Sequence, residues 1–124
     1  MFEITAEESF PAAHALGGYR GKCEYVHGHN YRLRVSLEAA ELDAAGLVVD
    51  FAEVRRLLRD LVEPFDHRLL NEVPPFDALN PTAENMARYF FEELSRRLAP
   101  HAPRVRVAEV RVWETETVTA AYRP

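Results

Sequence analysis

Residues 27–39 alternate apolar and polar side chains, and two histidines open this segment in phase with the apolar positions. Side chains two apart in a strand project from the same face. The imidazoles of His27 and His29 are therefore expected to leave one face of a strand side by side. The apolar members of that face are Tyr31, Leu33, Val35 and Leu37. The pattern predicts a half-buried strand whose buried face ends in two imidazoles, close enough to share one metal ion.

An earlier segment, residues 2–14, has the same alternation and ends in a third histidine. The apolar residues Phe2, Ile4, Ala6, Phe10 and Ala12 occupy even positions, as does His14. This favours a second half-buried strand, bent near Pro11. Three neutral imidazoles with no fourth protein ligand are typical of a catalytic zinc, which keeps one position open for substrate. We therefore predict that His14, His27 and His29 bind Zn²⁺.

Two other interpretations of the histidines stay open. They could pack or hydrogen-bond at the mouth of a loop without any metal. Alternatively, Cys23, four residues before His27, could be a fourth ligand that closes the site and makes the zinc structural. A lone cysteine can also be a small buried residue.

The middle of the chain predicts two helices. Asp50 with Glu53 three residues later is a capping-box-like start, and Pro64 ends this first helix. The second helix is expected to begin between residues 80 and 82 and to end at Pro100. Their apolar stripes have helical spacing: Phe51, Val54, Leu57, Leu58 and Leu61, then Ala83, Met86, Ala87, Phe90, Leu94 and Leu98.

The last part of the chain predicts two strands. Valines before residue 108 occupy odd positions and those after it occupy even positions, so a β-bulge is expected near Ala108-Glu109. A turn at 114–116 precedes a strand at 117–122. The element order ββααββ indicates one α+β domain over residues 1–124, with a four-stranded antiparallel sheet and two helices packed on one face.

Composition excludes several classes of protein. The formal net charge of −5 argues against a general nucleic-acid binder. A single cysteine rules out a disulfide within the chain and suggests a reducing compartment. The acidic N-terminal segment has no signal-peptide character, and no apolar run reaches transmembrane length. We expect a cytoplasmic protein without a membrane or nucleic-acid partner.

Five separated motifs run through nearly the whole chain. They are Phe10-Pro11-Ala12-Ala13-His14, Cys23-x3-His27-Gly28-His29-Asn30-Tyr31, Asp66-His67, Pro81-Thr82-Ala83-Glu84-Asn85 and Val112-Trp113-Glu114-Thr115. In this order they resemble the 6-pyruvoyl-tetrahydropterin synthase family. The resemblance implies the tunnelling fold (T-fold), in which subunits join their sheets into trimeric barrels and two trimers stack as a homohexamer.

The resemblance also implies roles for individual residues. It gives the three histidines to zinc and makes Cys23 the catalytic acid or base. Asp66 and His67 form a proton-relay pair, contributed in this family by a neighbouring subunit. Glu114 is expected to anchor the pterin by accepting hydrogen bonds from its guanidine-like edge.

Residues 82–84 match a further pterin-binding segment of the family, with Thr82 and Glu84 as the expected contacts. One position departs from the pattern, because Ala83 stands where the pyruvoyl-forming enzymes often have a second threonine.

Spacing within the second motif bears on the product. Three residues between Cys23 and His27 resemble the bacterial branch that forms 6-carboxy-5,6,7,8-tetrahydropterin, whereas the pyruvoyl-forming enzymes usually have a longer gap. Glu24, with two residues before His27, matches a third branch that acts on dihydroneopterin in folate synthesis. The chain carries both signatures.

The implied activity is that of a zinc-dependent carbon–carbon lyase in queuosine biosynthesis. It would convert 7,8-dihydroneopterin triphosphate to 6-carboxy-5,6,7,8-tetrahydropterin, acetaldehyde and triphosphate. The alternatives are 6-pyruvoyl-tetrahydropterin synthesis, cleavage of the dihydroneopterin side chain for folate, and a zinc-stabilised module that binds pterins without converting them.

Overall fold

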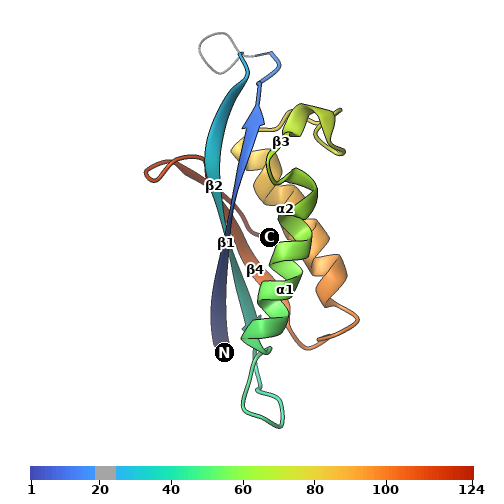
Figure 1. Ribbon diagram of the computed structural model, residues 1–124. Helices are drawn as coiled ribbons and strands as arrows, with labels where there is room; N and C mark the ends of the chain where they lie inside the picture. The colour runs from blue at the N-terminus through green and yellow to red at the C-terminus, as the bar shows by residue number, and fades with distance from the viewer. Residues whose placement is uncertain (19–24) are drawn as a thin grey trace.

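Two long antiparallel strands form the centre of the sheet (Figure 1). The computed structural model describes residues 1–18 and 25–124. In it, β1 (Phe2–His14) and β2 (His27–Ala39) pair along their whole length, so that His14 lies directly opposite His27. Both predicted strands are confirmed, and so are their buried faces, except that Phe2 at the start of β1 is 48% exposed.

The sheet has five strands in the order β3-β1-β2-β4-β5, and it is mixed. β3 (Arg68–Leu69) runs parallel to β1, whereas β4 (Arg106–Trp113) and β5 (Thr119–Tyr122) are antiparallel to their neighbours. The predicted four-stranded antiparallel sheet is therefore wrong in strand number and in direction. β3 is only two residues long, too short to show alternation, and a bond from the His67 N–H to the Pro11 carbonyl (2.7 Å) joins it to β1.

The predicted bulge in β4 is confirmed. Ser36 lies opposite Glu109, while the next residue of β2, Leu37, lies opposite Val107. Ala108 is therefore the extra residue. Because of the bulge, the valines before it (Val105 and Val107) and after it (Val110 and Val112) all lie on the buried face of the sheet. From residue 110 onward, the even-numbered residues face the core.

Two helices cover one face of the sheet (Figure 1). They are α1 (Phe51–Val62) and α2 (Ala83–Leu98), with Asp50 and Thr82 as their N-caps. Two short 3₁₀ turns, η2 (Glu63–Phe65) and η3 (Leu70–Glu72), lie between them. Within the described residues, neither helix has the length and apolar character needed to cross a membrane.

The predicted apolar stripes are buried against the sheet, with one exception. Phe51 is 57% exposed although its spacing placed it in the stripe. It is the first residue of α1. The spacing predicts the face of a helix, but not how far along the helix that face is covered.

Candidate metal centre

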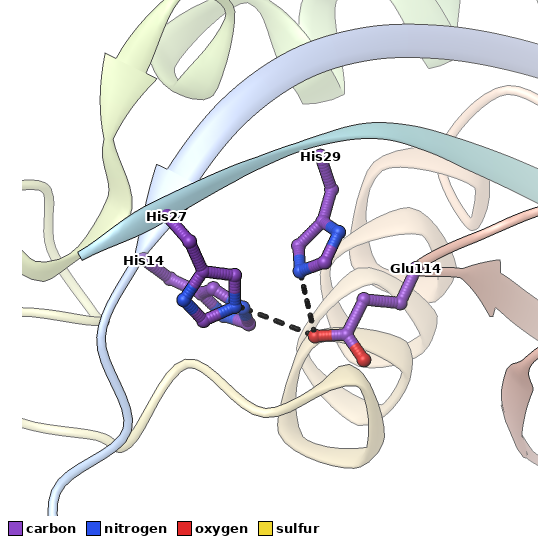
Figure 2. A group of neighbouring side chains, drawn as sticks. All are labelled: His14, His27, His29 and Glu114. Carbon is purple, nitrogen blue, oxygen red and sulfur yellow. Dashed lines mark hydrogen bonds and ion pairs between the residues drawn. The ribbon is translucent and has the colours of Figure 1, made fainter. Parts of the chain in front are cut away.

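The three predicted imidazoles converge on the helix-covered side of the sheet, at the ends of β1 and β2 (Figure 2). The ring centroid of His14 lies 4.6 Å from that of His27 and 5.1 Å from that of His29, and the latter two are 4.8 Å apart. His14 is fully buried, whereas His27 and His29 are half-buried. The alternation of two paired strands thus brings three imidazoles together.

Backbone carbonyls determine which nitrogen of two rings carries hydrogen. The Nδ1 of His14 lies 2.7 Å from the Pro81 carbonyl, and the Nδ1 of His27 lies 2.7 Å from the Tyr25 carbonyl. A carbonyl only accepts, so each Nδ1 is the donor, and in a neutral ring Nε2 is then an acceptor. These Nε2 atoms lie 3.0 Å apart. Two acceptors at this distance repel each other unless a cation lies between them, so the pair fits a metal ion.

His29 completes the set of imidazole donors. Its Nε2 is buried, and the polar atom that approaches it is the Glu114 Oε1, at 3.2 Å. Burial lowers the pKa of His14 and of His29, and the Glu114 carboxylate only partly opposes this. Both rings therefore favour the neutral form, which is the form that binds metals.

Glu114 points its carboxylate into the same cluster from the turn after β4 (Figure 2). Its Oε1 lies 3.0 Å from the Nε2 of His14 and 3.2 Å from the Nε2 of His29. The four candidate ligand atoms all lie within 4.8 Å of one another. Ligand atoms in a tetrahedral zinc site are separated by about 3.3 Å, so small side-chain adjustments would complete the shell.

Tyr31 packs beneath two of the imidazoles. Its ring centroid lies 5.7 Å from that of His14 and 5.4 Å from that of His29, and it stacks on Phe10. The side chain is fully buried, and burial raises the pKa of its hydroxyl. Tyr31 therefore gives the histidines a rigid apolar support, a role that follows from its predicted place on the buried face of β2.

Two asparagines hold the chain just beyond His14. The side-chain amide of Asn71 donates to the Ala15 carbonyl and accepts from the Ala15 N–H, both at 2.9 Å. The amide of Asn80 makes the same pair of bonds with Gly17, at 3.0 and 2.9 Å. Sequence reasoning missed both contacts, because Asn71 lies in the short turn η3 and Asn80 in the loop before α2, where no periodic pattern marks them.

Cys23 and Glu24 lie within residues 19–24, outside the described residues. The structure therefore does not test the catalytic role of Cys23, its alternative role as a zinc ligand, or the role of Glu24.

Asp66 and His67 form a close pair, with 2.8 Å between the Asp66 Oδ1 and the His67 Nδ1. The side chains are 46% and 77% exposed. Within the described residues neither bonds to the histidine cluster. His67 lines a cavity of about 470 Å³ that residues 28–30 of β2 also line. The pair thus lies near the candidate centre and is open to solvent.

Thr82 and Glu84 lie at the start of α2. The Thr82 hydroxyl accepts a hydrogen bond from the Asn85 N–H at 3.0 Å, which makes it the helix cap. Pro81, directly before it, supplies the carbonyl that orients His14. The Glu84 side chain is exposed in the first turn. The segment predicted to bind pterin is therefore adjacent to the cluster.

A second cavity, of about 430 Å³, opens beside the cluster. Glu114 and His29 line it together with Trp113 and Arg32, and the Arg32 guanidinium lies 4.0 Å from the Trp113 ring centroid. Glu114 thus borders both the imidazoles and an open space of the size that small-molecule sites have.

The chain matches the 6-pyruvoyl tetrahydropterin synthase family over residues 3–124. It is 31% identical to the 6-carboxy-5,6,7,8-tetrahydropterin synthase of Haemophilus influenzae over 99% of each chain. A protein of Archaeoglobus fulgidus, to which the same name is given provisionally, is 40% identical over 86% of each chain. The 6-pyruvoyl tetrahydrobiopterin synthase of Poecilia reticulata is 30% identical over 97% of this chain and 88% of its own.

Among solved structures, the chain resembles the 6-pyruvoyl tetrahydropterin synthase of Caenorhabditis elegans. The two superpose with a TM-score of 0.86 and 28% identity, over 99% of this chain and 95% of the other.

Proposed function

The chain belongs to the 6-pyruvoyl tetrahydropterin synthase family, and we propose that it is the zinc-dependent lyase that forms 6-carboxy-5,6,7,8-tetrahydropterin in queuosine biosynthesis. Its substrates are 7,8-dihydroneopterin triphosphate and one water, and acetaldehyde and triphosphate are the other products. The relatives from Haemophilus influenzae and Aquifex aeolicus, 31% and 32% identical, carry the name of this activity. The three-residue spacing between Cys23 and His27 supports the same branch.

One observation carries the proposal: the facing Nε2 acceptors of His14 and His27, with the buried Nε2 of His29 beside them. This all-imidazole donor set suits Zn²⁺. When bound, zinc would supply Lewis-acid polarisation of a substrate oxygen. The carbonyls of Pro81 and Tyr25 hold two of the rings in the tautomer that leaves Nε2 free for it.

The remaining residues supply proton transfer and substrate binding. Cys23 takes a proton from the side chain of the substrate or returns one to it, and His67, oriented by Asp66, exchanges protons with Cys23. The exposure of His67 supports a role in the site of a neighbouring subunit. Glu114, Thr82 and Glu84 bind the pterin.

A homohexamer built from two trimers would make this arrangement possible. The sheet face opposite the helices carries charged and aromatic side chains that pair with one another, such as Arg32 with Trp113 and Arg34 with Glu109. Such a polar face is compatible with the inner wall of a barrel of joined subunits. Sedimentation velocity would show a hexamer, whereas a monomer would contradict this part of the proposal.

The test of the activity is product analysis. Zinc-loaded protein is incubated with 7,8-dihydroneopterin triphosphate, and the products are identified by mass spectrometry beside a Cys23→Ala control. We expect 6-carboxy-5,6,7,8-tetrahydropterin and acetaldehyde from the unaltered protein only. A pyruvoyl product would favour the second activity found among the relatives. Zinc and pterin binding without turnover would favour a binding module.

Glu24 offers a second activity that a separate assay can test. Because Glu24-x2-His27 matches the dihydroneopterin-cleaving branch, Glu24→Gln is expected to reduce cleavage of dihydroneopterin more than formation of the carboxy product. Equal losses in both assays would remove this alternative.

A further inference from the structure

Glu114 reaches the histidine cluster from a strand that contributes none of the imidazoles. It follows β4, whereas the histidines lie on β1 and β2. We propose that Glu114 is the fourth ligand of the metal before substrate binds, and that an entering pterin draws it away. The second half of this inference rests on the proposed function, in which Glu114 binds the pterin.

The local structure aims Glu114 at this position. After the bulge, the even-numbered residues of β4, Val110 and Val112, face the core. Glu114 is the next even-numbered residue, directly after the strand, and its side chain leaves on the same face. Its N–H donates to the Val118 carbonyl at 3.1 Å, which fixes the start of the turn. The side chain is 23% exposed, and it follows the buried side of the sheet toward His14 and His29.

Four potential ligand atoms converge: the Nε2 atoms of His14, His27 and His29 and the Oε1 of Glu114. When His14 and His27 are neutral, their Nε2 atoms are both acceptors, and they face each other at 3.0 Å. Protons alone would satisfy the cluster only if one of these two rings were charged, which burial opposes for His14. A divalent cation at the centre satisfies all four at once, and the carboxylate offsets part of its charge.

With Glu114 bound, all four positions of the metal are occupied by protein ligands before substrate binds. A zinc site with four protein ligands has no position for a substrate oxygen. Glu114 also lines the adjacent cavity of about 430 Å³, so a small rotation of its side chain would carry the carboxylate from the cluster into that space. The guanidine-like edge of a pterin, which donates hydrogen bonds, would hold it there. Pterin recognition would thereby open the metal.

Cobalt substitution tests the ligand directly, without turnover. The visible absorption of Co²⁺ responds to a change from carboxylate to water, and its titration gives the metal affinity. We expect Glu114→Gln to change the spectrum and to weaken Co²⁺ binding at least about 10-fold. The matched control is Glu116→Gln, the same change at an exposed position in the same turn, which should match the unaltered protein. An unchanged spectrum and affinity in Glu114→Gln would overturn the assignment.

A titration of unaltered cobalt protein tests the release step and needs no variant. Pterin without a side chain is added, and its binding is followed by fluorescence. We expect the cobalt spectrum to move toward that of Glu114→Gln as pterin binds. A bound pterin that leaves the spectrum unchanged would overturn the release. Product formation by the unaltered protein is scored separately, so the proposed function can stand or fail independently of the ligand assignment.

Discussion

The Nε2 atoms of His14 and His27 lie 3.0 Å apart, and in each ring the opposite nitrogen bonds to a backbone carbonyl. Neither ring can turn its hydrogen toward the other without losing that carbonyl bond. The two strands therefore hold a pair of acceptors at a distance that only a shared cation makes favourable. We therefore propose that metal binding underlies the chemistry of this chain.

Removing one imidazole should abolish tight metal binding. In His27→Ala we expect the bound zinc to fall from one ion per chain to none after dialysis, with affinity lowered more than about 100-fold. His101→Ala serves as the control, because His101 is exposed in the loop after α2 and lies outside the cluster. Elemental analysis measures both variants. Full zinc occupancy in His27→Ala would contradict the site.

Metal removal should destabilise the fold. Zinc that binds the folded chain alone stabilises it by about 4 kcal/mol when free zinc is about 1,000 times Kd. A chelator should therefore lower the Tm of the unaltered protein while leaving that of His27→Ala unchanged. Thermal scans with and without chelator measure this. Equal shifts in both proteins would show that the chelator acts elsewhere.

The strands that carry the histidines could be predicted from the sequence, because alternation with a period of two is a local property. The bounds of β1 and β2 and the bulge at Ala108 followed from it, and the helical spacing of apolar residues predicted the buried stripe of α2 in the same way. β3 could not be predicted, since two residues show no alternation and its pairing depends on contacts with β1.

The groups that surround the imidazoles were harder to predict from the sequence than the imidazoles themselves. The carbonyls of Pro81 and Tyr25 are backbone groups, which every residue carries, so no sequence signal marks them. Glu114 was predicted to bind pterin, and its approach to the histidines was missed. The parity of β4 after the bulge was the signal that could have revealed it.

Asn71 should stabilise the chain where it leaves the metal site. Asn71→Ala removes both bonds to Ala15, which are partly buried, and should lower the free energy of unfolding by about 1–3 kcal/mol. Asn80→Ala should cost less, because water can replace its exposed bonds to Gly17. Urea unfolding measures both. A loss in Asn71→Ala no larger than that in Asn80→Ala would contradict this reasoning.

Glu93 should contribute stability that acid removes. Hydrogen bonds from Arg96 and Arg97 lower the pKa of this carboxyl below its ordinary value of 4.5. Its contribution is therefore present above the unfolded pKa and is lost as pH falls through the folded pKa. Glu93→Gln should reduce stability by up to about 1 kcal/mol at pH 7, and by progressively less as the pH falls below 4.5. A difference in acid equal to that at pH 7, measured by urea unfolding, would contradict this.

Cys23 should matter for turnover but not for the metal. Cys23→Ala is expected to retain zinc and to lose at least about 100-fold in kcat, as expected when a positioned acid or base is removed. Elemental analysis and steady-state kinetics measure the two effects on one preparation. Loss of zinc in this variant would instead make Cys23 a ligand, as in a closed structural site.

The most direct test of the account is acetaldehyde release by one preparation in three states. Protein is assayed with 7,8-dihydroneopterin triphosphate when zinc-loaded, after stripping by chelator, and after zinc is restored. We predict acetaldehyde and 6-carboxy-5,6,7,8-tetrahydropterin in equal amounts from the loaded and restored protein, and neither product from the stripped protein. Undiminished turnover after stripping, or consumption of substrate without acetaldehyde, would contradict a zinc-dependent lyase.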